Sequence, residues 1–283
     1  MKASGKMEKF DERKLRRTVM RAGADKSLAE KVVKEVKKRT RDGTTTREIL
    51  QTALNILDRD QPHIAAKYDL KGAIMRMGPA GYDFEKYFAA ILKEHGYITR
   101  HHRMVQGGCV RHEIDVTAEK ELRAEAFAKS IKHYMIELKY HSSRGIYTGL
   151  KEALYTYARF LDLLDGWKKG TCEKFDQPWL VCNTKFSDDA LEYGNCKKMR
   201  LIGWNYPTDM GLERMIESNG LYPVTALRGV DERMLKQLSD GNVMLCKDLL
   251  RKSVKKLQET TGIPKVKLED LIDQSRKLIG DGA

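Results

Sequence analysis

Two stretches of this sequence place charged residues inside runs that otherwise have the composition of buried strands. They are "EIDV" at 113–116 and "YMIELKYH" at 134–141. Strands favour β-branched, aromatic and long apolar residues, and both runs are rich in them. Alternation along the second run places Glu137 and Lys139 on one face of the strand. Because buried charge is costly, this pattern predicts a site that uses both charges.

Both runs belong to a segment, about residues 79–206, whose pattern alternates between strands and helices. The expected elements are a helix at 82–95, strands at 97–105, 109–118 and 132–140, a helix at 145–166, a strand at 179–184, a helix at 187–198 capped by Ser187, and a strand at 199–204. This order, α-β-β-β-α-β-α-β, predicts a mixed sheet flanked by helices.

The order of elements, with acids on the second and third strands, resembles the PD-(D/E)XK nuclease superfamily. The most similar branch is the Mrr-like restriction endonuclease domain, whose opening helix and first strand match "GYDFE" at 81–85 and "HGY" at 95–97. The resemblance covers about 125 residues. It implies that Asp115 is the catalytic aspartate and that residues 137–139 form the (D/E)-x-K triplet.

The chemistry implied is metal-assisted hydrolysis of a phosphodiester bond. Asp115 and Glu137, with the backbone carbonyl of Leu138, would hold Mg²⁺ or Mn²⁺. Lys139 would position the attacking water and offset charge on phosphorus, and Glu85 on the preceding helix would be an accessory acid. The alternative for Glu137 and Lys139 is a salt bridge on a solvated sheet face.

The histidines and cysteines show no spacing typical of a metal motif or a disulfide framework. The histidines near the acidic motifs are expected beside a phosphate-binding cleft; they are His101, His102, His112 and His141. The five cysteines are scattered at Cys109, Cys172, Cys182, Cys196 and Cys246. With no apolar run of membrane-spanning length and no signal-peptide pattern, a cytoplasmic protein without a membrane partner is expected.

Positive charge is concentrated in the N-terminal segment. Lys and Arg exceed Asp and Glu by 13 in the 283 residues, and residues 1–78 carry nine of these excess charges. A basic balance of this kind is typical of proteins that bind phosphate, in nucleic acids or in nucleotides.

Residues 1–78 have the pattern of a small helical domain preceded by an extended arm. We expect two helices within 12–40, the second capped by Ser27. Thr46 is the expected N-cap of a third helix, and a fourth helix is expected to begin near Pro62.

The arm "KASGKMEKFDERK" at 2–14 resembles the opening of the ATP cone, the regulatory nucleotide-binding module of ribonucleotide reductases. The segments "RAGA" at 21–24, "TTTREIL" at 44–50 and "IAAKYDL" at 64–70 follow in the order that the module has. The residues that match its opening pattern are Lys2, Ser4, Gly5, Glu8, Phe10, Asp11 and Lys14.

The resemblance implies that residues 1–75 bind ATP or dATP as a regulatory ligand. A hairpin at Gly5 would let backbone N–H groups approach phosphate, and Lys2, Lys6 and Lys14 would supply positive charge. Thr46 at a helix N-terminus would add a hydroxyl. No P-loop is present, so nucleotide hydrolysis is not expected. The alternative is a helical bundle whose lysines face solvent.

The C-terminal segment, about 207–283, reads as two similar halves at 221–250 and 254–280. Each is expected to contain a helix, a glycine turn and another helix, and together they resemble tandem helix-hairpin-helix units that bind the DNA backbone. A role in protein packing remains open for one hairpin, because Asp231 beside the first turn would repel DNA.

The sequence therefore predicts an α+β multidomain protein: an ATP cone at 1–78, a nuclease domain at 79–206 and an all-α DNA-binding region at 207–283. Its expected function is an ATP-regulated, Mg²⁺-dependent DNA endonuclease whose grip on DNA is sequence-tolerant. A non-catalytic, nucleotide-responsive DNA-binding protein on a nuclease fold is the alternative, and RNA as substrate stays open. Control by the nucleotide would act through packing of the cones, either in a homo-oligomer or across the cleft.

Overall fold

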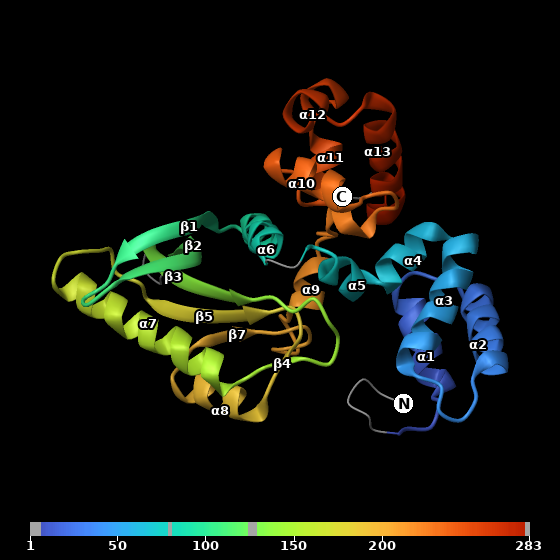
Figure 1. Cartoon of the computed structure of the whole chain (residues 1–283), viewed down its shortest axis with the longest axis horizontal. Helices are drawn as coiled ribbons and strands as arrows, with labels where there is room; N and C mark the ends of the chain where they lie inside the picture. The colour runs from blue at the N-terminus through green and yellow to red at the C-terminus, as the bar shows by residue number, and fades with distance from the viewer. Residues whose placement is uncertain (1–6, 79–80, 124–128, 281–283) are drawn as a thin grey trace. The chain divides into compact units, whose positions relative to one another are not determined.

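The computed structural model describes residues 7–78, 81–123 and 129–280. Contacts within the chain divide it into two compact units (Figure 1). One unit is residues 77–221, and the other combines residues 1–76 with residues 222–283. Assignment of three separate functions along the chain remains a prediction.

The unit of residues 77–221 is a mixed sheet with helices on its faces, which confirms the α+β class. Its main strands are β1 (Ile98–Gln106), β2 (Arg111–Arg123), β3 (Lys129–Lys139), β5 (Gln177–Cys182) and β7 (Arg200–Ile202). Their order in the sheet is β1-β2-β3-β5-β7, with antiparallel pairing up to β3 and parallel pairing beyond it. Two short strands, β4 (Tyr147–Thr148) and β6 (Lys185–Phe186), pair with each other.

Helices cover both faces of this sheet. They are α6 (Tyr82–Glu94), α7 (Leu150–Lys168), α8 (Asp188–Cys196) and α9 (Leu212–Glu217). On one face, Ala153 of α7 and Ala190 of α8 share a buried cluster with Leu180 of β5. On the other face, the hydroxyl of Thr99 in β1 donates to the carbonyl of Ala89 in α6. A strand contributes alternate residues to the two faces, so both faces of the sheet are buried.

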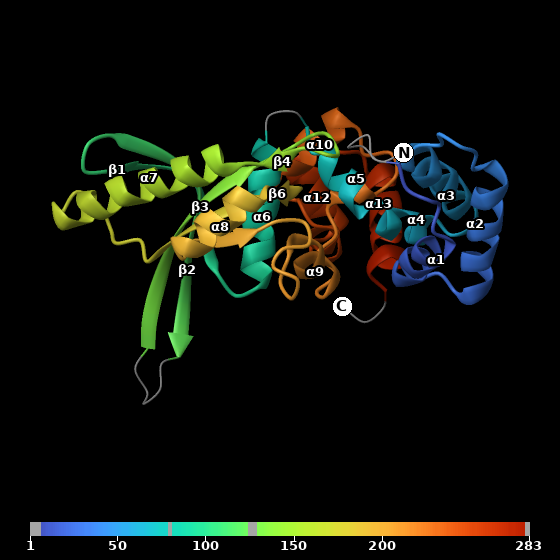
Figure 2. The same ribbon diagram turned by 90° about the horizontal axis from the view of Figure 1, so that it is seen from below.

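Strand boundaries differ from expectation mainly at the β2–β3 hairpin. The second and third strands were expected at 109–118 and 132–140, but they run to Arg123 and start at Lys129. Figure 2 shows β2 and β3 continuing as a two-stranded ribbon beyond the rest of the sheet. The charged sequence "EKELR" at 119–123 hid this extension, because it lacks the alternating apolar residues of the strand pattern. Ser187 caps α8 as expected, accepting from the N–H of Ala190.

The second unit is helical throughout its described residues. Its N-terminal helices are α1 (Glu12–Arg21), α2 (Lys26–Arg39), α3 (Thr46–Asp60), α4 (Pro62–Tyr68) and α5 (Leu70–Met75). The C-terminal part adds a 3₁₀ turn, η2 (Val224–Ala226), and helices α10 (Glu232–Asp240), α11 (Cys246–Arg251), α12 (Val254–Thr261) and α13 (Lys265–Ile279). No helix in the described ranges has the length and apolarity that crossing a membrane requires.

Two expected helix starts were wrong by one or two residues. Thr45, not Thr46, is the N-cap of α3, and it forms a capping box with Glu48. Thr46 is the first helical residue. Asp25, not Ser27, caps α2 by accepting from a backbone N–H. Neighbouring Thr, Ser and Asp residues can all cap a helix. The residue that becomes the N-cap is the one whose side chain accepts a hydrogen bond from the backbone N–H three residues later.

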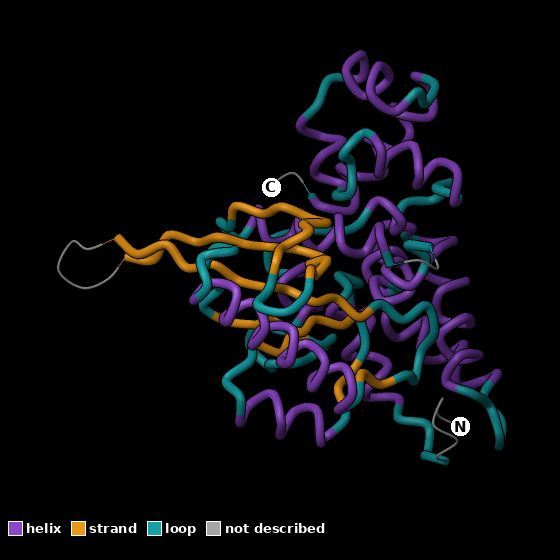
Figure 3. The backbone as a smooth tube through the Cα atoms, turned by 60° about the vertical axis from the view of Figure 1, so that its left-hand side comes forward, coloured by secondary structure: helices purple, strands orange, loops and turns teal. Residues whose placement is uncertain are grey.

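The C-terminal halves differ from each other. The second half is two helices joined by a turn at Gly262, whose φ of +68° places it in the left-handed region. In the first half, only the 3₁₀ turn η2 precedes the glycine turn at Gly229, so the expected leading helix is wrong there. Figure 3 shows this region as helices joined by loops.

Candidate functional site

Backbone pairing between neighbouring strands is interrupted around Asp115, and we call this interruption the opening. Pairing of β1 with β2 skips the position of His102 and Asp115, and pairing of β2 with β3 ends at Val116 and Ile136. His102 has a φ of +52°, which is uncommon for a residue other than glycine. At the opening, Oδ2 of Asp115 accepts a hydrogen bond of 2.7 Å from the backbone N–H of Leu138. A carboxylate therefore takes the position of the missing backbone acceptor.

Three carboxyl groups from three elements lie near enough to one another at this opening to interact electrostatically. They are Glu85 of α6, Asp115 of β2 and Glu137 of β3. Burial, together with repulsion from Asp115 and the neighbouring acids, raises the pKa of Glu85 to about 8 and that of Glu137 to about 7. Burial also raises the pKa of Asp115. Each charged carboxylate disfavours charge on the others, which is the electrostatic condition that a bound cation relieves.

Arg159 of α7 holds the site together from the sheet face that α7 covers. Arg159 is 7% exposed, and its guanidinium donates to Oε2 of Glu137 and to the backbone carbonyl of Glu113. The guanidinium also lies over the ring of Tyr155, 5.3 Å from its centroid. Glu137 therefore has Arg159 as its ion-pair partner. Arg159 fixes the orientation of this carboxylate and joins β2 to β3 past the end of their ladder.

His102 connects two acids on the opposite side of the opening. Its Nε2 lies 3.0 Å from Oε2 of Glu85, and its Nδ1 lies 3.1 Å from Oε1 of Glu113. Tyr82 stacks on the ring at a centroid distance of 4.8 Å. The Glu85–His102 approach lacks hydrogen-bond geometry, so both atoms are among the few buried polar atoms without a partner in the described residues. Buried polar atoms are normally hydrogen-bonded, so this pair of facing atoms is unusual.

Lys139 is exposed, two residues beyond Glu137 on the same strand. Its positive charge lowers the pKa of Glu137, although less than burial raises it. An exposed lysine beside buried carboxylates is placed to meet an incoming anion.

The other histidines have structural partners. His112 lies 2.8 Å from Oδ2 of Asp162 in α7, and His141 lies 3.0 Å from the hydroxyl of Thr148. His101 is exposed, and burial together with nearby positive charge lowers its pKa.

A second group of metal-ligand type lies elsewhere on the sheet. Glu119, His133 and Glu173 have ligand atoms within 4.8 Å of one another, and they form the one such group of three found among the described residues. Arg103 already forms an ion pair with Glu173. Asp115, Glu137 and Glu85 do not converge this closely, so an ion there would rest on two carboxylates, a backbone carbonyl and water.

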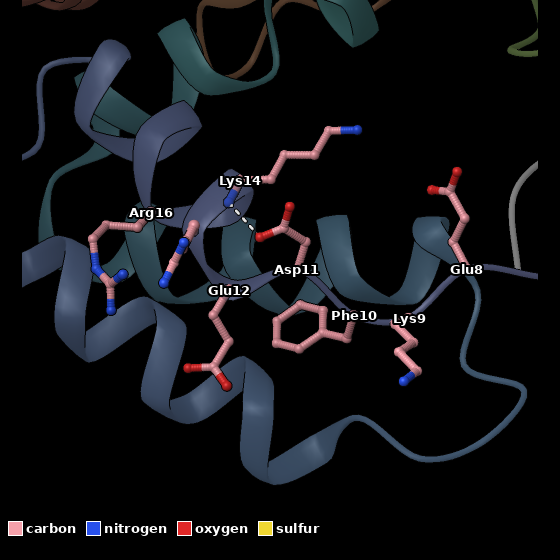
Figure 4. A pocket seen from close by; sticks show the side chains of 8 residues that line it. Glu8, Lys9, Phe10, Asp11, Glu12, Lys14 and Arg16 are labelled. Carbon is pink, nitrogen blue, oxygen red and sulfur yellow. Dashed lines mark hydrogen bonds between the residues drawn. The ribbon is translucent and has the colours of Figure 1, made fainter.

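In the helical unit, the end of the N-terminal arm forms an open cavity of about 710 Å³. Figure 4 shows Glu8, Lys9, Phe10, Asp11 and Lys14 around it. Oδ1 of Asp11 caps α1 by accepting from the N–H of Lys14 at 3.0 Å. Glu8, Asp11 and Lys14 therefore line one surface, and their role in binding a nucleotide remains a prediction. The expected phosphate-binding residues Lys2, Gly5 and Lys6 lie outside the described residues.

Sequence reasoning missed the roles of Arg159 and His102. Arg159 lies on the buried side of its helix with Thr156 and Phe160, so an arginine at an apolar position was a readable signal of a buried carboxylate partner. His102 gave no comparable signal, because its contact with Glu85 depends on a backbone conformation that the sequence does not announce.

Comparisons with known proteins give two matched segments. Residues 1–70 match the model of the ATP cone domain, and residues 222–279 match that of the C-terminal domain of AF1548-like proteins. The first match confirms the predicted ATP cone.

Two full-length relatives are similar to most of this chain. An uncharacterized protein of Archaeoglobus fulgidus is 43% identical over 192 residues, which is 68% of this chain and 99% of that protein. The crystal structure of the protein of unknown function AF1548 is 42% identical with a TM-score of 0.59, over 70% of this chain and 98% of that one. The MspJI restriction endonuclease, solved with a 27-mer oligonucleotide, gives a TM-score of only 0.28 at 11% identity, over 58% of this chain and 32% of that one. So low a similarity supports no conclusion.

Proposed function

The chain belongs to the AF1548-like family, and we propose that it is a metal-dependent DNA endonuclease controlled by a nucleotide bound to its ATP cone. The observation that carries this proposal is the group of largely shielded carboxyls, Glu85, Asp115 and Glu137, at the opening of the β2–β3 ladder. Glu85 and Glu137 have pKa values of about 8 and about 7, and exposed Lys139 lies beside them. Perturbed acids with an adjacent free cation are typical of catalytic sites.

The residues suit a hard divalent cation. Asp115 and Glu137 each have one carboxylate oxygen engaged, by the N–H of Leu138 and by Arg159, and the second oxygen is the proposed ligand. Magnesium is commonly bound by one or two carboxylates while it keeps several waters, so two carboxylates and the carbonyl of Leu138 are sufficient. A bound divalent ion would supply charge stabilisation at phosphorus and acidify a water molecule.

The chain's own residues have separate roles in this proposal. Lys139 binds the phosphate and offsets the charge that develops on it. Glu85 holds a proton at neutral pH, because its pKa is about 8, and its unpartnered Oε2 is the proposed donor of that proton to the leaving oxygen. Arg159 is a positioning residue that orients Glu137.

DNA as the substrate is supported by charge and by the C-terminal turn. The chain carries a net charge of +13. Lys265 and Lys267, both exposed, follow the turn at Gly262 at the start of α13. Backbone N–H groups and lysines at a helix N-terminus bind phosphate without reading sequence.

Nicking of supercoiled plasmid with Mg²⁺ or Mn²⁺ tests the activity. Asp115→Asn removes the negative charge but keeps an oxygen that accepts a hydrogen bond from the N–H of Leu138. This variant therefore tests the role of the charge without disturbing the fold. We expect Asp115→Asn and Lys139→Ala to lower the rate at least about a hundredfold. Glu121→Gln, an exposed acid on the same strand as Asp115, is the matched control and should cut like wild type. Equal rates for all four proteins would reject the site.

A further inference from the structure

Helix α7 has a second apolar surface on the side that faces away from the sheet. Its members are Leu150, Leu154, Ala158 and Leu161, and all four are exposed. The leucines keep 36%, 44% and 44% of their surface accessible. At 3.6 residues per turn these positions fall within about 80° of one another around the helix axis. We call these four residues the outer stripe of α7.

The outer stripe is not part of the buried core. The residues of α7 that pack on the sheet are Ala153, Thr156, Arg159, Phe160, Leu163 and Gly166. These occupy the opposite side of the helix. A surface helix normally presents polar residues to water, so a helix with apolar residues on both sides is expected to have a partner on each. Single exposed leucines are common, but a contiguous row of them marks an interaction surface.

We propose that the outer stripe binds the same stripe of a second copy of this chain, with the two α7 helices antiparallel about a two-fold axis at Ala158. The sequence around Ala158 is suited to this symmetry. Leu154 precedes Ala158 by four residues, and Leu161 follows it by three. In an antiparallel pair, Leu154 of one copy therefore lies opposite Leu161 of the other copy. The small side chain of Ala158 at the crossing lets the two backbones approach. Such an interface uses one surface twice, as two-fold dimers do.

Charges at the two ends of the stripe select the antiparallel arrangement. Lys151 lies seven residues before Ala158, and Asp165 lies seven residues after it. In the antiparallel pair, Lys151 faces the partner's Asp165, at both ends of the contact. A parallel pair would bring Lys151 against Lys151 and Asp165 against Asp165, which is unfavourable. Asp165 bonds Lys168 at 2.8 Å within the chain, but both side chains are more than half exposed, so this pair is weak and exchangeable.

The proposed dimer goes beyond the nuclease assignment and does not depend on it. It also places the contact on the helix that carries Arg159, the residue after Ala158, which holds Glu137 on the sheet side. Each copy would then keep a complete site on its own sheet.

Sedimentation equilibrium of the full chain tests the dimer. The wild type is expected at twice the 32.5 kDa of one chain. Leu154→Asp combined with Leu161→Asp should raise the dimer dissociation constant at least tenfold, because it buries four carboxylates in the contact. Ile131→Asp, at a 59% exposed apolar position on β3, is the matched control and should leave the mass unchanged. A monomeric wild type, or a double variant that remains a dimer, would overturn the proposal.

A charge-exchange series tests the antiparallel arrangement. Lys151→Asp and Asp165→Lys should each weaken the dimer, and the two together should restore it. Failure of the combined variant to recover would overturn the antiparallel pairing. Ala158→Cys provides a second readout that does not depend on folding stability, since it should form an interchain disulfide under mild oxidation. No increase in crosslinking over the wild type, which supplies the background of the native cysteines, would also overturn it.

Discussion

At the scale of single residues, Arg159 is the side chain on which the buried acids depend. It is the ion-pair partner of Glu137, and both side chains are largely shielded from water, with 8% and 18% of their surface exposed. Removing one member of a buried pair leaves the other charge without compensation, whereas replacing both by apolar residues avoids that cost.

We therefore expect Arg159→Leu to lower the unfolding free energy of residues 77–221 by roughly 3–5 kcal/mol. Arg159→Leu with Glu137→Leu should lose much less than the sum of the single variants. All three tryptophans, Trp167, Trp179 and Trp204, lie in this unit, so urea unfolding followed by tryptophan fluorescence reports on it alone. Additive losses would mean that the two residues do not interact.

The raised pKa values of Glu85 and Glu137 predict a pH dependence of stability in the absence of metal. Both pKa values, about 8 and about 7, lie above the ordinary value of 4.5, so the folded state holds protons that the unfolded state has released. The contribution of these two groups to the unfolding free energy is complete below about pH 4.5 and is lost as pH rises through 7 to 8. Each group adds a slope of at most about 1.4 kcal/mol per pH unit.

Chemical unfolding between pH 5 and pH 8.5 measures this slope. Glu85→Gln should flatten it, because a neutral amide does not titrate. Addition of Mg²⁺ should oppose the loss at high pH, since a metal binds the deprotonated carboxylates. A stability that rises steadily from pH 5 to pH 8 would contradict the assignment of these groups as protonated acids.

Charges that interrupt apolar strands drew attention to Glu137 and Lys139, and the family resemblance added Asp115. The structure brings the carboxyls of Asp115 and Glu137 near each other, and their catalytic roles remain predictions. Arg159 was missed because the amphipathic helix was read only for its apolar residues. His102 could not be predicted, since its role follows from a left-handed backbone at one position. Thr46 was misassigned as a cap although Thr45 has the capping partner Glu48.

At the scale of elements, the α12–α13 hairpin is the part of the C-terminal region best suited to the DNA backbone. The turn at Gly262 has its neighbour Ile263 fully buried, which fixes the turn against the helices. Lys265 and Lys267 then project from the first turn of α13. The first half lacks a leading helix, and Asp231 is occupied in capping α10.

The hairpin predicts a salt dependence of DNA binding. Lys265→Ala with Lys267→Ala should weaken binding to DNA of any sequence and reduce the slope of log affinity against log salt by about 2. Lys236→Ala with Lys247→Ala, which removes two lysines of the same region away from the hairpin, is the control. Fluorescence anisotropy over a salt titration measures both. An unchanged slope would assign the hairpin to protein packing.

The succession α-β-β-β-α-β-α-β was predictable from hydrophobic periodicity and holds for the five strands of the main sheet and the helices between them. The short strands β4 and β6 were not predicted, and β4 lies within residues 145–166, where a helix was expected. The extent of the β2–β3 ribbon was not predictable, because the sequence around residues 119–123 has no apolar alternation. The outer stripe of α7 was readable in principle, but a helix that is apolar on two sides is easily taken for a fully buried one.

At the scale of the whole molecule, the ATP cone is the expected point of control. Its cavity at the end of the arm is lined by Lys14 but not by Arg17, which is exposed on the same helix. We expect Lys14→Ala to weaken ATP binding at least about tenfold, since a charge-assisted phosphate contact contributes roughly 1.5–3 kcal/mol. Arg17→Ala removes the same charge outside the cavity and should have little effect.

Isothermal titration calorimetry with ATP, dATP and ADP measures these affinities. The nicking rate with and without ATP then reports coupling, for which a few-fold to hundredfold change is typical of regulation by a second site. Binding that is insensitive to Lys14→Ala would place the nucleotide elsewhere in the chain.

The central claim is that the buried acids form a metal site for phosphodiester cleavage. Anomalous scattering from crystals grown with Mn²⁺ tests it most directly, because the ion's position is seen independently of any activity. We expect an anomalous peak contacting Asp115 and Glu137 that disappears in Asp115→Asn crystals. A peak only at Glu119, His133 and Glu173, or none between Asp115 and Glu137 at saturating Mn²⁺, would contradict it.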